Sequence, residues 1–217
     1  MGIPVLIIGG SGSGKSTALR NLNPDDVLHI RSVKKSLPFS SRNWKPLNKS
    51  NPKGSYIQTD NYATIHKALD RALEIGKKII VIDDSNYLMQ NEAMRRVNET
   101  GYSKFTAMAK AYWDLLIHAQ DLGSDIRVYF MCHSQADSEG IQKPKTIGKM
   151  LDDQVCIEGL FTIVLGANYN VEEERYYFST RKREDVVKTP LGMFEESEID
   201  NCLKLVDETI CEYEGIE

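Results

Sequence analysis

Two kinds of apolar pattern alternate along the chain: short continuous runs and longer stretches with helical spacing. The runs predict strands at residues 4–8, 27–30, 56–59, 79–82, 127–132, 161–166 and 175–180. Residues 79–82 are all apolar and β-branched, which indicates a strand buried on both faces, as in a parallel sheet covered by helices. The pattern therefore predicts an α/β fold whose sheet is mostly parallel.

The stretches with helical spacing lie between these runs. They predict helices at residues 62–75, 89–97 and 105–119, and Gly76 is a typical helix stop. The two late strands are joined by an acidic turn, so we expect them to be antiparallel. Residues 195–213 predict an acidic amphipathic helix. We therefore expect one core domain over residues 1–194, followed by an acidic helix or tail over residues 195–217.

A glycine-rich string of the form G-x-x-x-x-G-K-S follows the first predicted strand and precedes a helical pattern. Such a string turns backbone N–H groups inward around a nucleotide phosphate, and its lysine reaches the β- and γ-phosphates. Its serine hydroxyl is a ligand for Mg²⁺. A flexible Gly/Ser linker would lack this strand-to-helix context. We predict a site for ATP and Mg²⁺ made of Gly9, Gly10, Ser11, Gly12, Ser13, Gly14, Lys15, Ser16 and Thr17.

Two carboxylates, Asp83 and Asp84, end the most apolar strand of the chain. Ligands of parallel sheets bind at the carboxyl ends of strands, so this pair resembles a Walker B element. We predict that Asp83 holds Mg²⁺ and that Asp84 orients or deprotonates an attacking water. The alternative is that two acidic residues simply end a strand. The next buried strand ends in His133 and Gln135, which either sense the γ-phosphate or have a structural role.

Charge is distributed unevenly, although the net charge is only −4. Every charged residue in the segment 31–53 is basic, whereas residues after 194 are mostly acidic. The basic segment lacks periodicity and contains Trp44 and Lys45, which suit phosphate contacts and base stacking on single-stranded DNA. The alternative is a solvated loop with Trp44 packed onto the body. The four cysteines have no ligand spacing and no signal or membrane segment is present, so we expect a cytoplasmic protein without zinc.

The order of these motifs resembles a RecA-type ATPase core, most closely the small phage-encoded RecA-like proteins associated with single-strand annealing and recombination. The resemblance implies that Gln135 couples the γ-phosphate to a DNA-contacting loop at residues 136–150. Basic residues on a late strand would complete the nucleotide site of a neighbouring subunit in a homo-oligomer. The resemblance thus assigns Lys143, Lys145 and Lys149 to DNA and Arg181, Lys182 and Arg183 to the neighbouring site.

The chain departs from that family at one catalytic position. Where bacterial RecA carries a glutamate after its second strand, this chain has Arg31 and Ser32. Either Asp84 takes over that role or hydrolysis is weak. Three functions stay open: an ATPase acting on single-stranded DNA, a small-molecule kinase with a phosphate loop, and a nucleotide-gated regulatory or packaging protein without DNA contact.

Overall fold

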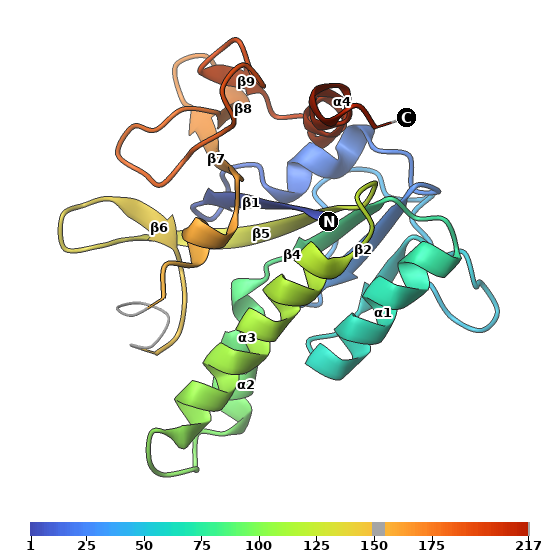
Figure 1. Cartoon of the computed structure of the whole chain (residues 1–217), viewed down its shortest axis with the longest axis vertical. Helices are drawn as coiled ribbons and strands as arrows, with labels where there is room; N and C mark the ends of the chain where they lie inside the picture. Colours follow the sequence, from blue (N-terminus) through green and yellow to red (C-terminus); the bar gives the residue numbers. More distant parts are fainter. Residues whose placement is uncertain (149–154, 217) are drawn as a thin grey trace.

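A twisted sheet forms the centre of the molecule in the computed structural model, which describes residues 1–148 and 155–216 (Figure 1). Within these residues the sheet has nine strands in the order β3-β2-β4-β5-β1-β7-β8-β9, and β6 pairs with the end of β5. The strands are β1 (Ile3–Gly9), β2 (Val27–Arg31), β3 (Tyr56–Gln58), β4 (Ile79–Asp83), β5 (Arg127–Ala136), β6 (Gln142–Pro144), β7 (Ile163–Asn170), β8 (Arg175–Ser179) and β9 (Glu198–Asp200).

Strands β3, β2, β4, β5, β1 and β7 run parallel, and β8 and β9 add to β7 antiparallel. The predicted α/β class, a mostly parallel sheet with late antiparallel strands, is therefore confirmed. All five residues of β4 are buried, as the β-branched run predicted. Strand β5 lies between β1 and β4, so the carboxyl ends of these three strands meet at one edge of the sheet.

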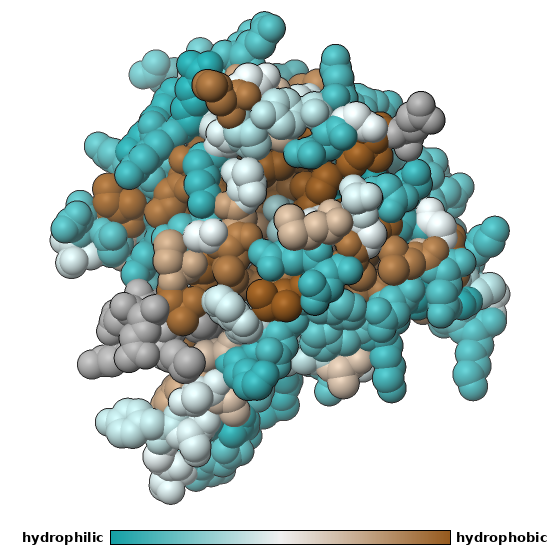
Figure 2. Space-filling model, viewed as in Figure 1, coloured by the Kyte–Doolittle hydropathy of each residue, from teal (hydrophilic) through white to brown (hydrophobic). Residues whose placement is uncertain are grey.

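Helices cover both faces of the sheet, each over its own apolar cluster. Helices α1 (Tyr62–Glu74), α2 (Asn86–Arg95) and α3 (Ser103–Asp121) contribute to the larger cluster. The 3₁₀ helix η1 (Ser16–Asn21) and helix α4 (Leu203–Glu214) contribute to the second cluster on the opposite face. A short 3₁₀ turn, η3 (Ile157–Leu160), precedes β7. In Figure 2, apolar side chains gather over the central strands, and hydrophilic ones cover the periphery.

The structure differs from the sequence-based expectation in several local elements. The helix after the glycine-rich string is a six-residue 3₁₀ helix. Helix α2 begins at Asn86, and the acidic C-terminal helix begins only at Leu203, after the unpredicted strand β9. The stretch that follows Ala136, expected to be an irregular loop, pairs with β5 through β6 and forms a hairpin. Neither β6, which reads Gln-Lys-Pro, nor β9, which reads Glu-Ile-Asp, contains a continuous apolar run that would predict a strand.

Helix α4 is fixed to the sheet by a buried ion pair. Arg127 Nη2 lies 2.8 Å from Asp207 Oδ2, and Tyr129 donates its hydroxyl to Asp207 Oδ1 at 2.6 Å. Burial lowers the pKa of Arg127, but the hydrogen bond and charge of Asp207 outweigh this effect and raise the pKa above its usual value. The acidic C-terminal segment is thus packed onto the sheet through α4.

Within the described part of the chain, no helix combines the length and apolar character that crossing a membrane requires.

We predict that Asp207→Ala destabilises the fold strongly, because it leaves the Arg127 guanidinium buried without its partner. Removal of one member of a buried ion pair typically costs about 3–5 kcal/mol in the free energy of unfolding. Urea unfolding followed by circular dichroism measures this change. Glu208→Ala, one residue further along α4 and exposed, is the control and should change stability by less than about 0.5 kcal/mol. A loss of that small size in Asp207→Ala would contradict the anchoring role.

Candidate functional site

The glycine-rich loop connects the end of β1 to η1 in a conformation that depends on its glycines. Gly14 has a φ of +93°, a backbone conformation that residues other than glycine rarely adopt. A Cβ atom on Gly9 would lie 2.5 Å from the carbonyl oxygen of Ala167 on β7. The glycines therefore allow the loop to turn tightly against the sheet, as the motif predicted.

Lys15 folds back over this loop. Its Nζ donates hydrogen bonds of 2.7 Å to the carbonyl oxygens of Gly9 and Gly10. Burial lowers the pKa of Lys15, against the opposing effect of the Asp84 and Asp83 charges. The buried Ser13 hydroxyl has no hydrogen-bond partner among the described residues. A phosphate oxygen could accept from the third N–H of the Lys15 ammonium and from the Ser13 hydroxyl, so the loop fits a nucleotide phosphate.

Ser16 and Asp83, the two predicted Mg²⁺ ligands, lie next to each other. The Ser16 hydroxyl lies 3.1 and 3.0 Å from the two carboxylate oxygens of Asp83, across the carboxyl ends of β1 and β4. A hydroxyl and a carboxylate beside a phosphate loop are oxygen ligands of the kind Mg²⁺ takes together with phosphates and waters. In the described part of the chain no cluster of three or more His, Cys, Asp or Glu side chains could hold a metal alone.

His29 on β2 supports Asp83 from behind, and the sequence analysis did not identify it. His29 Nε2 lies 3.3 Å from Asp83 Oδ2, and Arg31 Nε donates to His29 Nδ1 at 3.2 Å. Because Nδ1 accepts, Nε2 carries the proton and donates to the carboxylate. Burial lowers the pKa of His29, which keeps the ring neutral near pH 7. A lone polar residue inside a buried strand was the only signal for this role.

Asp84 has a strained backbone and two partners. Its φ is +53°, although it is not a glycine, and such strain is often kept at functional sites. The carboxylate forms an ion pair with Lys35, and its Oδ1 lies 3.4 Å from His133 Nε2. Burial raises the pKa of Asp84, but hydrogen bonds from His133 and Lys35 reverse this and hold it below the usual value. Asp84 is therefore an ionised carboxylate at the edge of the site.

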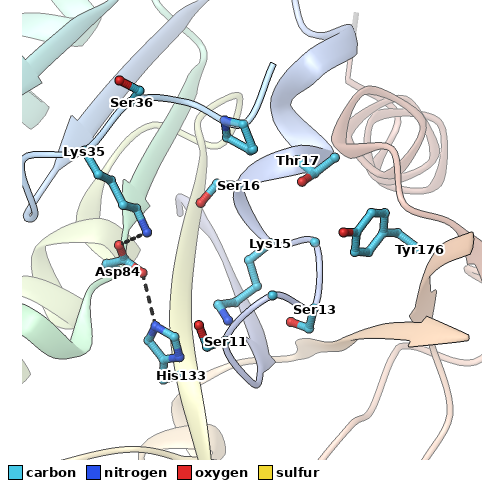
Figure 3. A pocket seen from close by; sticks show the side chains of 13 residues that line it. Ser11, Ser13, Lys15, Ser16, Thr17, Lys35, Ser36, Asp84, His133 and Tyr176 are labelled. Carbon is cyan, nitrogen blue, oxygen red and sulfur yellow. Dashed lines mark ion pairs between the residues drawn. The ribbon is translucent and has the colours of Figure 1, made fainter. Parts of the chain in front are cut away.

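Lys15, Ser16, Asp84 and His133 are among the residues that line a pocket of about 270 Å³ over the glycine-rich loop (Figure 3). One wall is the loop itself, from Ser11 to Thr17, and the opposite wall includes Asp84 and His133. Sequence reasoning missed four lining residues, which are Lys35, Ser36 and Pro38 from the loop after β2 and Tyr176 from β8. Lys35 belongs to an aperiodic segment and Tyr176 to a late strand, so neither carried a motif that placed it here.

Other predicted residues lie outside this pocket. Gln135 follows His133 on β5 and pairs with Lys143 in the hairpin, Lys145 lies just after β6, and Lys149 falls outside the described residues. The expected trans-acting residues, which are Arg181, Lys182 and Arg183, are exposed in the turn after β8.

Trp44 corrects one expectation from the sequence. The residue is only 7% exposed, and its ring packs edge-on against His29 at a centroid distance of 5.7 Å. It also contacts the ring of Phe39 at 6.1 Å and belongs to the second apolar cluster. A ring packed in this way offers no open face to a base. The alternative prediction, with Trp44 packed onto the body, describes this structure, whereas the neighbouring Lys45 is exposed.

Comparisons with known proteins give matches only among solved structures. No protein-family model matches the chain, and no curated protein matches it. Among solved structures, a KaiC-like protein from the hyperthermophilic archaeon Pyrococcus horikoshii OT3 is similar, with a TM-score of 0.48 and 15% identity over 83% of this chain and 78% of that one. A similarity this low decides neither family nor function. The strand order and the geometry of the glycine-rich loop therefore carry the structural argument.

We predict that Lys15→Ala lowers the affinity for ATP at least about 100-fold, because it removes the buried cation next to the phosphate loop. Fluorescence titration with an N-methylanthraniloyl derivative of ATP measures this affinity. Lys67→Ala, an exposed lysine on α1, is the control and should bind like the unmodified chain. Retained ATP affinity in a folded Lys15→Ala protein would refute the assignment of the loop.

Proposed function

We propose that this chain is a Mg²⁺-dependent ATPase that acts on single-stranded DNA in recombination or replication of the phage type. The observation that carries the ATPase part is the contact between Ser16 and Asp83, with Oγ 3.0 Å from Oδ2, beside the glycine-rich loop. This pairing gives the loop the two oxygen ligands that a bound nucleotide and Mg²⁺ require.

The residues predicted from the sequence have distinct roles in this proposal. Lys15 and the backbone N–H groups of the loop bind the β- and γ-phosphates, and Ser16 and Asp83 hold Mg²⁺, which when bound neutralises phosphate charge. Asp84 orients the attacking water. Arg31 and Ser32, which stand at the position of the RecA glutamate, carry no carboxylate. Arg31 contacts His29 and lies over the ring of Tyr56, and the Ser32 hydroxyl donates to a backbone carbonyl. This arrangement supports Asp84 as the group that replaces the glutamate of bacterial RecA.

Strand β5 links the pocket to the proposed DNA surface. His133 lines the pocket, and its carbonyl oxygen accepts a hydrogen bond of 2.7 Å from Lys145 N. Two residues beyond His133, Gln135 pairs with Lys143 across the hairpin. A shift of His133 upon nucleotide binding would therefore move the backbone of Lys145 directly and that of Lys143 through Gln135. We place DNA phosphates on Lys143 and Lys145, with Lys149 and Lys45 as further contacts.

We predict that the chain binds an oligothymidylate at low salt and that its ATP turnover rises when this DNA is present. Lys143→Ala/Lys145→Ala should weaken DNA binding at least about 5-fold and reduce the salt dependence, since each lost phosphate contact changes the log–log slope by about 0.7. Fluorescence anisotropy over a salt series measures both quantities. Lys67→Ala/Lys110→Ala, which removes two exposed lysines from α1 and α3, is the matched control.

Absence of DNA binding at low salt, together with ATP turnover that ignores DNA, would contradict the DNA role. Such a protein would be a nucleotide-gated regulator without DNA contact. Turnover that appears only with a small-molecule phosphate acceptor would instead identify a kinase.

The proposal includes a homo-oligomer whose nucleotide sites are shared between subunits. The basic turn after β8 is exposed and does not line its own pocket. Arg183 Nη2 lies 2.7 Å from Glu198 Oε1, and Arg181 Nη2 donates to the carbonyl oxygen of Glu195 at 2.7 Å. These contacts hold the turn at the surface, where a neighbouring subunit can meet it.

We predict that two inactive variants restore activity when mixed. Lys15→Ala keeps the basic turn, whereas a chain with Ala at Arg181, Lys182 and Arg183 keeps the phosphate loop. In a head-to-tail ring assembled from equal amounts, about a quarter of the sites would receive both intact parts. The ATPase rate of the mixture measures this recovery. Turnover no higher than the sum of the separate variants, with mixed oligomers demonstrated, would contradict shared sites.

A further inference from the structure

Lys35 is the second lysine that lines the nucleotide pocket, next to Lys15. It comes from the loop after β2, and its Nζ reaches across to the carboxylate of Asp84 (Figure 3). This places the ammonium group on the side of the pocket where Asp83 and Asp84 end β4. No motif assigns Lys35 a role, and the proposed mechanism does not use it.

The backbone that carries Lys35 is held on both sides. Before it, the Ser32 hydroxyl donates to the carbonyl oxygens of Asp83 and Asp84 at 2.5 and 2.8 Å. After it, Leu37 and Phe39 pack against the second apolar cluster. The loop therefore keeps its position beside the end of β4. The Lys35 side chain itself is 48% exposed, which leaves room for its Nζ to change partners.

The charges of the pocket favour such a change. Besides burial, the ammonium of Lys35 contributes to lowering the pKa of Lys15, so the two lysines lie within electrostatic range. Lys15 is fixed over the glycine-rich loop, where the β-phosphate binds, whereas Lys35 lies toward the carboxylates. A γ-phosphate extends from the β-phosphate toward the Mg²⁺ ligands and carries more charge than the single Asp84 carboxylate. It would therefore compete with Asp84 for the Lys35 ammonium.

We propose that Lys35 is a γ-phosphate ligand that the chain supplies to its own nucleotide site, and that its Nζ moves from Asp84 to the γ-phosphate when a triphosphate binds. ADP, which has no γ-phosphate, leaves the Lys35–Asp84 pair intact. This inference rests on the proposed nucleotide site. It adds a means by which the site distinguishes ATP from ADP, and it releases Asp84 from one partner only in the triphosphate state.

Binding of the non-hydrolysable analogue AMPPNP and of ADP, both with Mg²⁺, tests the proposal by titration calorimetry. Lys35→Ala should lower the affinity for AMPPNP about 10-fold and change that for ADP less than about 2-fold. Lys35→Arg should recover part of the AMPPNP affinity. Lys34→Ala, an exposed neighbour in the same loop, is the matched control and should change neither.

A double-mutant cycle with Asp84→Asn separates direct contact from simple neutralisation of Asp84. If Lys35 binds the γ-phosphate, Lys35→Ala weakens AMPPNP binding about 10-fold in the Asp84→Asn background too. If Lys35 only neutralises Asp84, its removal has no effect once residue 84 is uncharged, and the proposal is overturned. Equal losses for AMPPNP and ADP also overturn it. Absence of binding of either nucleotide to the unmodified chain would instead refute the proposed function itself.

Discussion

The carboxylate of Asp83 is the group on which the arrangement of the site depends. It is 3% exposed at the end of β4, and a buried carboxylate without partners would be costly. Ser16 donates to it from the glycine-rich loop, and His29 donates from β2, with Arg31 fixing the tautomer of the ring. These contacts join strands β2 and β4 and the start of η1 around one charge. The carboxylate is thereby aimed at the phosphate loop before any ligand binds.

Strand β5, which lies between β1 and β4, connects the pocket to the hairpin with β6. Because the three strands are parallel, their carboxyl ends form one edge, and His133 lies between the phosphate loop and Asp84. The same strand continues into the hairpin with β6, which carries Lys143. His133, which lines the pocket, and Lys143, which is proposed to contact DNA, therefore lie on the two paired strands of one hairpin. The Lys35–Asp84 pair adds a connection from the loop after β2 to the same edge.

The predictions from the sequence were most accurate for elements whose structure is determined by a backbone constraint or a long apolar run. The glycine-rich loop, the buried strand β4 and the closeness of Ser16 to Asp83 all follow from local patterns. His29 and Lys35 could not be placed in this way, because their roles arise from pairing between β2 and β4 and from a loop without periodicity. The same limit explains Trp44: composition suited base stacking, but tertiary packing buries its ring against His29. The hairpin of β5 and β6 was missed because β6, which reads Gln-Lys-Pro, contains no apolar run.

We propose that the chain has one nucleotide site, in which Ser16 and Asp83 hold Mg²⁺. Titration calorimetry of the unmodified chain with ATP, once with Mg²⁺ and once with excess EDTA, measures whether this site exists. We expect saturable binding of one ATP per chain with Mg²⁺ and an affinity at least about 10-fold lower in EDTA. Absence of saturable binding, or an affinity that ignores Mg²⁺, would contradict it.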